Sequence, residues 1–369
     1  MNVLVMRSLN DILTAVAERF DLQLERSNPA GGGFSGAEVF RVVAADGREF
    51  AFRKTPQKFA LPEERLRALH GLLAAVHRSG VVEISVPRIP GARINRDSPQ
   101  EISLVTGKAA PSPDPWIRFG TDLWQVEPWM PGSSISRGEV SQHQQQSALH
   151  RLDDYHAAAA DHVSQGNHSV WFRNSQEPSP AILRRQKITE ELLNGGMETL
   201  WQQAASDPDP YFRNSAFGAC RVLSDRLTWL HQELTGLTKQ LFAVQPVLRD
   251  VWRAHVLFTD DRVTGLIDLS AAASDHVAID AARLLRSWFG TETGRLIDVV
   301  TEFASQQSFN RAERQLMRAL DASSVLLSPL TWIRRRTGAA ERGAFPPEMQ
   351  ARFDEVTAIA QAFEPLPME

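Results

Sequence analysis

Several features that would point to common protein classes are scarce in this sequence. It has one cysteine, Cys220, among 369 residues, so neither a disulfide framework nor a cysteine-built zinc or iron–sulfur site can form within one chain. No apolar run approaches the roughly 18 residues of a membrane span, and Arg7 and Asp11 interrupt any signal-peptide pattern. Lys and Arg total 40 against 44 Asp and Glu, which gives no basic excess for nucleic acid. We therefore expect a cytoplasmic protein that binds neither membrane nor nucleic acid.

What is present divides into two parts of different character. A chain of 369 residues with 43% hydrophobic content is longer than most single cores require. In the first part, the residue patterns predict strands over 30–55, 81–89, 104–106 and 123–127, with a hairpin turn at Asp46-Gly47, and helices over 9–20 and 63–78. In the second part, they predict helices over 138–160, 181–203, 213–241, 278–289, 295–306, 310–323 and 349–363, interrupted by a β island at 246–268. We expect a β-rich part over 1–130 and a helical part over 131–369, joined by a hinge at 127–132.

Two carboxylates flank a predicted hairpin in the β island. Asp250 precedes the strand 256–258, and Asp268 follows the return strand 263–267. Carboxylates that converge at one end of a small sheet suit metal coordination or acid–base chemistry. Asp is also common in turns and caps, so a purely local role is the competing interpretation.

A glycine cluster and a pair of cations lie earlier in the chain. Residues 31–36 read GGGFSG, and glycines let backbone amides approach phosphate oxygens closely. Arg53 and Lys54 follow on the next strand but one, on opposite strand faces. Each feature alone is common, but the order of glycine loop, strand cation, hinge and two aspartates is more informative than any single one.

In this order the sequence resembles the aminoglycoside phosphotransferase-like and choline kinase-like small-molecule kinases. Leu248-Arg249-Asp250 stands where the family has H-G-D, Ile267-Asp268-Leu269 matches its metal-binding motif, and residues 280–285 (DAARLL) match its D-x-A segment. The resemblance covers about residues 8–330. It implies an α+β, two-lobe protein-kinase-like fold, with an N-lobe over 1–130 and a helical C-lobe that carries a catalytic hairpin at 245–270.

The resemblance also implies an ATP-dependent phosphotransferase that phosphorylates a small-molecule hydroxyl. Asp250 would be the catalytic base, with Arg253 as a second catalytic residue, and Asp268 and His255 would hold Mg²⁺. The remaining implied residues would bind ATP, through the glycine loop, the strand cation and the hinge: Gly32, Gly33, Phe34, Ser35, Arg53, Lys54, Glu127, Trp129 and Met130. Arg53 matches the family's strand lysine better than Lys54 does, and Glu63, Glu64 and His70 are the candidates to pair with it.

The sequence departs from the family pattern at three positions of the site. Leu248 replaces the loop histidine, His255 replaces the asparagine that binds a second metal, and Arg53 replaces lysine. These changes leave a catalytically silent nucleotide-binding pseudokinase or scaffold as the alternative to an enzyme. Residues 131–369 carry 29 Asp and Glu against 24 Lys and Arg, an excess that would suit a cationic acceptor. We expect a monomer or a dimer.

Overall fold

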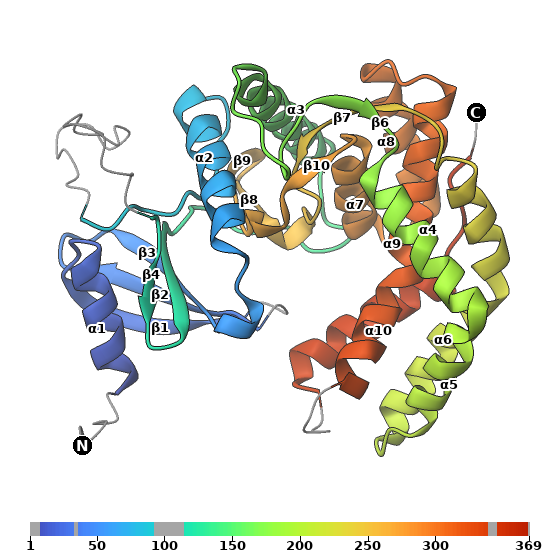
Figure 1. Ribbon diagram of the computed structural model, residues 1–369, viewed down its shortest axis with the longest axis horizontal. Coiled ribbons are helices and arrows are strands. Elements are labelled where there is room, and N and C mark those ends of the chain that lie inside the picture. Colours follow the sequence, from blue (N-terminus) through green and yellow to red (C-terminus); the bar gives the residue numbers. More distant parts are fainter. Residues whose placement is uncertain (1–7, 33–35, 92–113, 339–344, 368–369) are drawn as a thin grey trace. The chain divides into compact units, whose positions relative to one another are not determined.

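The computed structural model describes residues 8–32, 36–91, 114–338 and 345–367. The chain divides into two compact units, Met1–Pro131 with Thr264–Asp268, and Gly132–Val263 with Leu269–Glu369. A β-sheet in the N-terminal part and helices in the C-terminal part confirm the expected α+β class (Figure 1).

The first unit is built on a five-stranded antiparallel sheet. Its strands follow the order β1-β2-β3-β5-β4 across the sheet. The strand bounds are β1 Leu24–Gly32, β2 Glu38–Ala44, β3 Glu49–Thr55, β4 Ile117–Phe119 and β5 Asp122–Pro128, and the helices are α1 Leu9–Arg19 and α2 Glu63–Ser79. The hairpin predicted at Asp46-Gly47 joins β2 to β3, with Gly47 at a φ of 80°.

Helix α1 covers one face of this sheet. Ser8 caps the helix by accepting from the Asp11 amide, and Asp11 accepts in return from the Ser8 amide. The buried side chains of Leu13, Val16 and Phe20 pack against strand residues such as Phe52. Burial of apolar side chains, each contributing roughly 1.5–3 kcal/mol, holds the helix on the sheet.

The second unit is mainly helical. Its helices are α3 Gln142–Ser164, α4 Pro180–Glu191, α5 Met197–Ala205, α6 Pro210–Thr235, α7 Ala278–Phe289, α8 Thr293–Gln306, α9 Arg311–Gly338 and α10 Pro347–Gln361. A small sheet has the order β10-β7-β6, and the hairpin β8-β9 forms a second one. These strands are β6 Ser175–Glu177, β7 Phe242–Val247, β8 Val256–Thr259, β9 Arg262–Leu266 and β10 Ala273–Asp275. Helix α7 is buried on nearly all sides, which makes it the central helix of the unit.

Several local predictions need correction. The strand expected over 81–89 is reduced to an isolated parallel bridge between Ile84 and Leu266, and this bridge helps to place Thr264–Asp268 with the first unit. The helix expected over 181–203 is two helices, separated by a π-helical segment in which Gly195 has a φ of 99°. The helix expected over 310–323 continues to Gly338. The strand expected over 104–106 lies outside the described residues. Among the described helices, none is both long and apolar enough to span a membrane.

Candidate active site

In the first unit, Arg53 of β3 is the centre of an ion-pair cluster. Its Nη1 donates to Asp268 Oδ1 at 2.8 Å, and its Nε lies 3.9 Å from Glu127 Oε1. Ser85 Oγ donates to the other Glu127 oxygen at 2.7 Å and fixes that carboxylate. Burial lowers the pKa of Arg53, but Glu127 and Asp268 outweigh this effect, so the pKa is raised. The Arg53 guanidinium therefore keeps a permanent positive charge beside the Asp268 carboxylate.

Lys54 points to a different set of partners. Its Nζ lies 2.8 Å from Glu38 Oε1 and 3.6 Å from Asp122 Oδ2. These pairings follow from the strand alternation, which sends neighbouring side chains to opposite faces of the sheet. Of the two cations that the sequence left open, Arg53 is the one that contacts Asp268.

The partner of Arg53 comes from the hinge strand β5 and not from α2. Glu63 forms ion pairs with Arg67 and Arg118, and Glu64 is exposed. The buried His70 ring is hydrogen-bonded to Gln125 at 2.8 Å, and burial lowers its pKa to about 4. The sequence offered these three helix residues as partners, whereas the structure gives that place to Glu127.

The structure describes part of the glycine loop. Gly32 ends β1 opposite Glu38, whereas Gly33, Phe34 and Ser35 lie outside the described residues. At Gly36, which has a φ of 80°, a Cβ atom would come within 2.5 Å of the Phe59 ring, so a side chain does not fit there.

The hinge residues after β5 are held by neighbouring strands. Trp129 N donates to Glu49 O at 3.0 Å, and the Arg41 guanidinium lies 4.9 Å from the centroid of the Trp129 ring. A Cβ atom on Gly265 would lie 2.8 Å from Met130 Cβ, so glycine at that position lets the hinge pack closely against β9.

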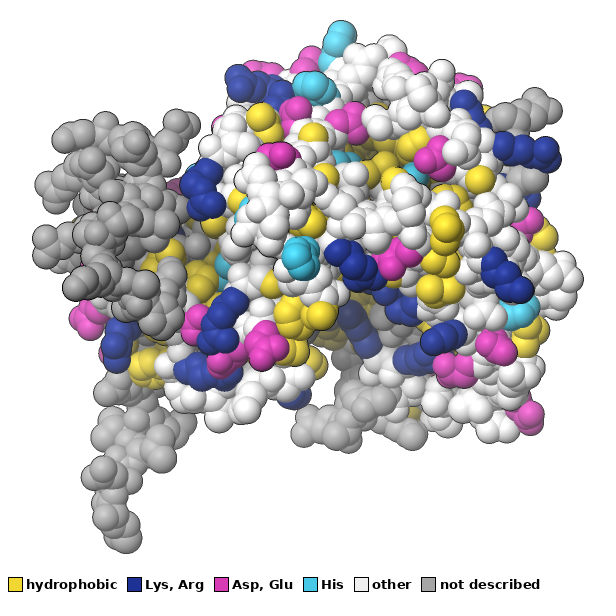
Figure 2. All heavy atoms as spheres, turned by 45° about the horizontal axis from the view of Figure 1, so that its top comes forward, with side chains coloured by type: hydrophobic (Ala, Val, Ile, Leu, Met, Phe, Trp, Pro, Cys, Tyr) yellow, Lys and Arg dark blue, Asp and Glu magenta, His cyan; other side chains and the backbone are white. Residues whose placement is uncertain are grey.

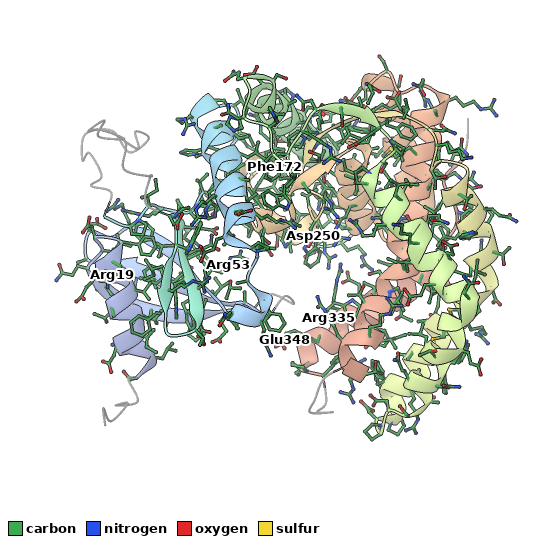
Figure 3. All side chains as sticks on the ribbon, in the orientation of Figure 1. Arg19, Arg53, Phe172, Asp250, Arg335 and Glu348 are labelled. Carbon is green, nitrogen blue, oxygen red and sulfur yellow. The ribbon has the colours of Figure 1, made fainter. Side chains whose placement is uncertain are left out.

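In the second unit, Asp250 lies in the loop between β7 and β8 (Figure 3). Its side chain is 45% exposed and forms an ion pair with Arg283 of α7. Partial burial lowers the pKa of Arg335 on α9, and the negative charge of Asp250 partly opposes this effect. Asp250 is thus an accessible carboxylate beside two arginines.

A buried carboxylate on α7 fixes the backbone of this loop. Asp280 is fully buried and accepts from Leu248 N at 2.7 Å, Arg249 N at 2.6 Å and His156 Nε2 at 2.8 Å. Arg249 has a φ of 65°, a conformation that costs a non-glycine residue roughly 1–2 kcal/mol. Charge-assisted hydrogen bonds to both amides compensate for this strain and hold the residues directly before Asp250.

The His255 ring has both nitrogens in use. Trp252 Nε1 donates to His255 Nε2 at 2.8 Å, and the backbone oxygen of Asp250 lies 2.8 Å from His255 Nδ1. An indole N–H can only donate and a carbonyl oxygen can only accept, so this geometry assigns a neutral ring protonated at Nδ1. No nitrogen lone pair is left for a metal ion, and the expectation of His255 as a Mg²⁺ ligand does not fit this arrangement.

Arg253 anchors the loop to two helices of the unit. Its Nη2 lies 2.7 Å from Glu355 of α10, and Nη1 donates to the Ser287 backbone oxygen at 3.3 Å. Its amide also donates to Ser287 Oγ at 2.8 Å. These contacts join Arg253 to α7 and α10, and its catalytic role stays a prediction.

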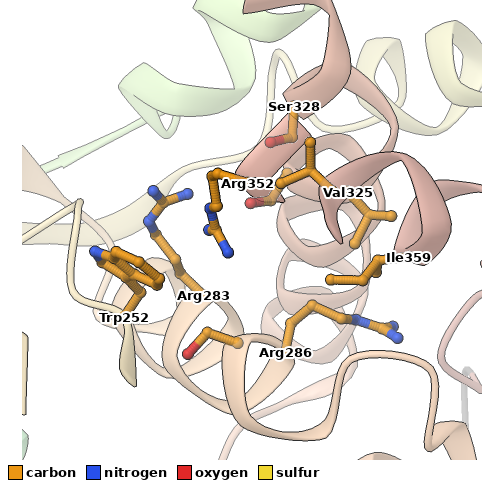
Figure 4. A pocket seen from close by; sticks show the side chains of 10 residues that line it. Trp252, Arg283, Arg286, Val325, Ser328, Arg352 and Ile359 are labelled. Atoms are coloured by element: carbon orange, nitrogen blue, oxygen red, sulfur yellow. The ribbon is translucent and has the colours of Figure 1, made fainter. Parts of the chain in front are cut away.

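A pocket opens in the same unit, between α7, α9 and α10 (Figure 4). It is lined by Trp252, Arg283, Arg286, Ser287, Ser324, Val325, Ser328, Arg352, Val356 and Ile359. Arg283 lines the pocket and is the ion-pair partner of Asp250, so the pocket adjoins the candidate base. These arginines carry no signal of a site in the sequence, because surface arginines are abundant and only the packing of the helices brings them together.

Among the described residues, no group of three or more His, Cys, Asp or Glu side chains is arranged to hold a metal ion. Arg53, Glu127 and Asp268 come together in the first unit, and Asp250, Trp252 and His255 in the second. Each of the two aspartate motifs is therefore built into a defined local arrangement.

Comparison by sequence gives one clear match. The sequence model of the phosphotransferase enzyme family matches residues 27–320. A search of curated proteins finds no match to the chain.

Solved structures of small-molecule phosphotransferases share the fold. An aminoglycoside phosphotransferase from Alicyclobacillus acidocaldarius subsp. acidocaldarius is 16% identical with a TM-score of 0.55, and the match covers 98% of this chain and 94% of that one. A macrolide 2′-phosphotransferase from Brachybacterium faecium is 18% identical with a TM-score of 0.53, covering 94% and 97%. An amicoumacin kinase solved in complex with AMP-PNP, Ca²⁺ and Ami is 12% identical with a TM-score of 0.61, and the match covers 98% of this chain and 96% of that one. At these identities the likeness concerns the fold alone.

Proposed function

Because the chain belongs to the phosphotransferase enzyme family, we propose that it transfers the γ-phosphoryl group of ATP to a hydroxyl group of a small molecule. The observation that carries the proposal is the cluster of Arg53, Glu127 and Asp268. Phosphoryl transfer depends on positioning and on charge neutralisation, and a strand cation paired to a glutamate beside a metal-binding aspartate is a recurring means of achieving both.

The residues of this cluster fit a nucleotide bound with Mg²⁺. Asp268 presents a carboxylate with a side chain 29% exposed, and Mg²⁺ is commonly bound by one or two carboxylates together with substrate phosphates. When bound, the metal neutralises charge on the phosphates. Arg53 would bind the phosphates, and Glu127 orients its guanidinium. The hinge residues Glu127, Trp129 and Met130 would line the adenine side, with Gly32 to Ser35 at the phosphates.

Asp250 acts in the proposed reaction as the acceptor of the hydroxyl proton. The hydroxyl oxygen forms a bond to the γ-phosphorus, the bond from that phosphorus to the bridging oxygen of ADP breaks, and Asp250 takes the proton. General-base groups contribute about 10²- to 10⁴-fold to rate. Leu248 N and Arg249 N donate hydrogen bonds to Asp280, and these bonds fix the loop that carries the Asp250 carboxylate.

A catalytically silent nucleotide-binding protein is the second candidate function. It is favoured by His255, which stands at the position of a second metal ligand and has both nitrogens engaged. Such a protein would bind ATP or ADP without turnover, and its ligand binding would be indifferent to Asp250→Asn.

Release of ADP over a panel of hydroxyl compounds separates the two functions. The panel comprises amino alcohols, sugars, aminoglycosides and hydroxy acids, each assayed with and without Mg²⁺. We expect Mg²⁺-dependent turnover that Asp250→Asn lowers by at least about 100-fold, while Asp298→Asn on an exposed position of α8 leaves it unchanged. Nucleotide binding without turnover of any acceptor would support the silent protein instead.

A further inference from the structure

The pocket beside Asp250 has an unusual charge composition. Its lining includes three arginines, Arg283, Arg286 and Arg352, and not one carboxylate among the described residues. The indole of Trp252 and the apolar side chains of Val325, Val356 and Ile359 complete much of the wall. In a partly enclosed site, charges interact more strongly than in water, so this composition selects the charge of a ligand.

The three arginines are not equivalent. Arg286 is held by Asp321 through two hydrogen bonds of 2.8 and 2.6 Å and is fixed by them. Figure 4 shows the guanidinium groups of Arg283 and Arg352 on the side of the pocket where Trp252 lies, while that of Arg286 extends away from them. The Arg352 guanidinium stacks over the Trp252 ring at 4.2 Å from its centroid. Arg283 and Arg352 are thus the two cations available to a ligand.

Carboxylates around these arginines are too few to balance them. Within the described part of the chain, Arg352 shares the carboxylate of Glu355 with Arg137 and Arg253, and Arg283 pairs with the carboxylate of Asp250 alone. These four arginines and two carboxylates carry a net charge of +2.

Further positive charge lies nearby. Arg335 and Arg249 form no ion pair with a carboxylate among the described residues, although Asp250 acts on Arg335 at longer range. The pKa of Arg185 is lowered to about 9, first by burial and then by the charges of Arg184, Arg283 and Arg249, while the charge of Asp275 acts to raise it. The region beside the candidate base is therefore short of negative charge.

From this arrangement we propose that the acceptor is an anionic hydroxyl compound, whose carboxylate or phosphate group is bound by Arg283 and Arg352 with Trp252 as the adjoining wall. The proposal rests on the proposed phosphotransfer, because it names the acceptor of that reaction. Arginine binds carboxylate and phosphate through paired N–H donors, so either group fits the same two side chains.

Binding of such an anion also prepares the base. In the absence of substrate, Arg283 is the ion-pair partner of Asp250. An anion that takes over Arg283 leaves the Asp250 carboxylate to accept a hydrogen bond from the substrate hydroxyl. Substrate binding and exposure of the base are coupled through one arginine.

An anionic acceptor differs from the cationic one that the acidic excess of residues 131–369 led us to expect. That excess does not gather around Asp250. Figure 2 shows Lys and Arg side chains interspersed with Asp and Glu among the described residues of the face that it presents. A cationic ligand in the pocket would face Arg283 and Arg352, which are like charges.

Matched pairs of compounds test the acceptor class. Calorimetric titration of the full chain without nucleotide compares glycerol 3-phosphate with glycerol and glucuronate with glucose, and ethanolamine serves as the cationic compound. The pairs distinguish phosphate from carboxylate recognition. We expect the anionic member of at least one pair to bind about tenfold tighter or better than its neutral partner. Arg352→Gln and Arg283→Gln should each remove most of the preference for the anionic compound. Arg335→Gln should reduce this preference, and it breaks no ion pair among the described residues, so its effect reports on the lost positive charge.

The control is Arg334→Gln, because Arg334 pairs with Glu191 outside the pocket. It should bind the anions as the wild type does. Equal binding of neutral, cationic and anionic compounds, no binding of either anion at millimolar concentration, or undiminished anion binding by both Arg352→Gln and Arg335→Gln would overturn the proposal. Release of ADP, assayed in parallel, distinguishes failure of the proposed phosphotransfer from failure of the proposed anionic acceptor. Anion binding without turnover counts against the phosphotransfer alone, and turnover of neutral or cationic acceptors alone counts against the anionic acceptor.

Discussion

Replacing Asp280 by asparagine should damage both stability and catalysis. The carboxylate is fully buried, and its Oδ2 accepts from both Leu248 N and His156 Nε2, while Oδ1 accepts from Arg249 N. An amide NH₂ in place of Oδ2 is itself a donor, so it would face the Leu248 and His156 N–H donors without accepting from either. Hydrogen bonds to a charged group contribute about 1.5–3 kcal/mol each, and removing one partner from a buried charged network costs about 3–5 kcal/mol. We expect Asp280→Asn to lower the free energy of unfolding by about 3 kcal/mol.

The same change should slow the reaction without weakening nucleotide binding. The loop before Asp250 contains Arg249 in a left-handed conformation that the Asp280 hydrogen bonds support. A misplacement of a reacting group by about 1 Å can cost about 100-fold in rate, so kcat should fall by that order while the KM for ATP stays within a few-fold. Urea unfolding followed by circular dichroism, and ADP release, measure the two effects, with Asp298→Asn on exposed α8 as the matched control. A loss of stability below about 1 kcal/mol together with an unchanged kcat would refute the supporting role of Asp280.

Three further predictions follow from other parts of the chain. Arg249→Gly should stabilise the protein by roughly 0.5–1 kcal/mol in urea unfolding, because glycine adopts a φ of 65° without strain. Glu127→Gln should raise the KM for ATP about tenfold while kcat changes less, because the guanidinium of Arg53 loses one of its two carboxylates. The pKa of His70 is lowered by burial from 6.5 to about 4, so the unfolded chain binds the proton first and stability falls as the pH drops through this window. The free energy of unfolding, measured by urea titration, should decrease between pH 7 and pH 5 in the wild type. In His70→Gln this decrease should be smaller by about 2 kcal/mol.

The parts of the fold that sequence predicted are those with a local cause. Ser8 before an amphipathic run marks the start of α1, and Asp46-Gly47 fixes the β2–β3 hairpin, since both signals act over a few residues. The three-residue strands β6 and β10 went unpredicted because pairing with the distant strand β7 creates them. Strand β4 pairs with the adjacent strand β5, and its three residues are too few to show an alternating pattern. The segment 81–89 is apolar enough for a strand, but tertiary packing leaves it only the bridge at Ile84.

The candidate site divides in the same way. Motif order singled out Arg53, Asp250 and Asp268, since residue type and position along the chain carry that signal. The partner of Arg53 was sought on a helix, and only the strand pairing of β3 with β5 reveals Glu127. The arginines of the pocket come from α7 and α10, which are far apart in sequence, so no local pattern could join them.

The central claim is that Asp268 is a ligand of the Mg²⁺ ion that binds together with ATP. Thermal unfolding with ATP, at Mg²⁺ concentrations from zero to saturation, tests it most directly. The account predicts a Mg²⁺-dependent rise in Tm for the wild type, equivalent to about 2.7 kcal/mol when ATP is at 100 times its Kd. Asp268→Asn should lose the Mg²⁺-dependent part, and Asp298→Asn should keep it. An equal Mg²⁺-dependent rise in Asp268→Asn, or no rise in the wild type, would contradict the account.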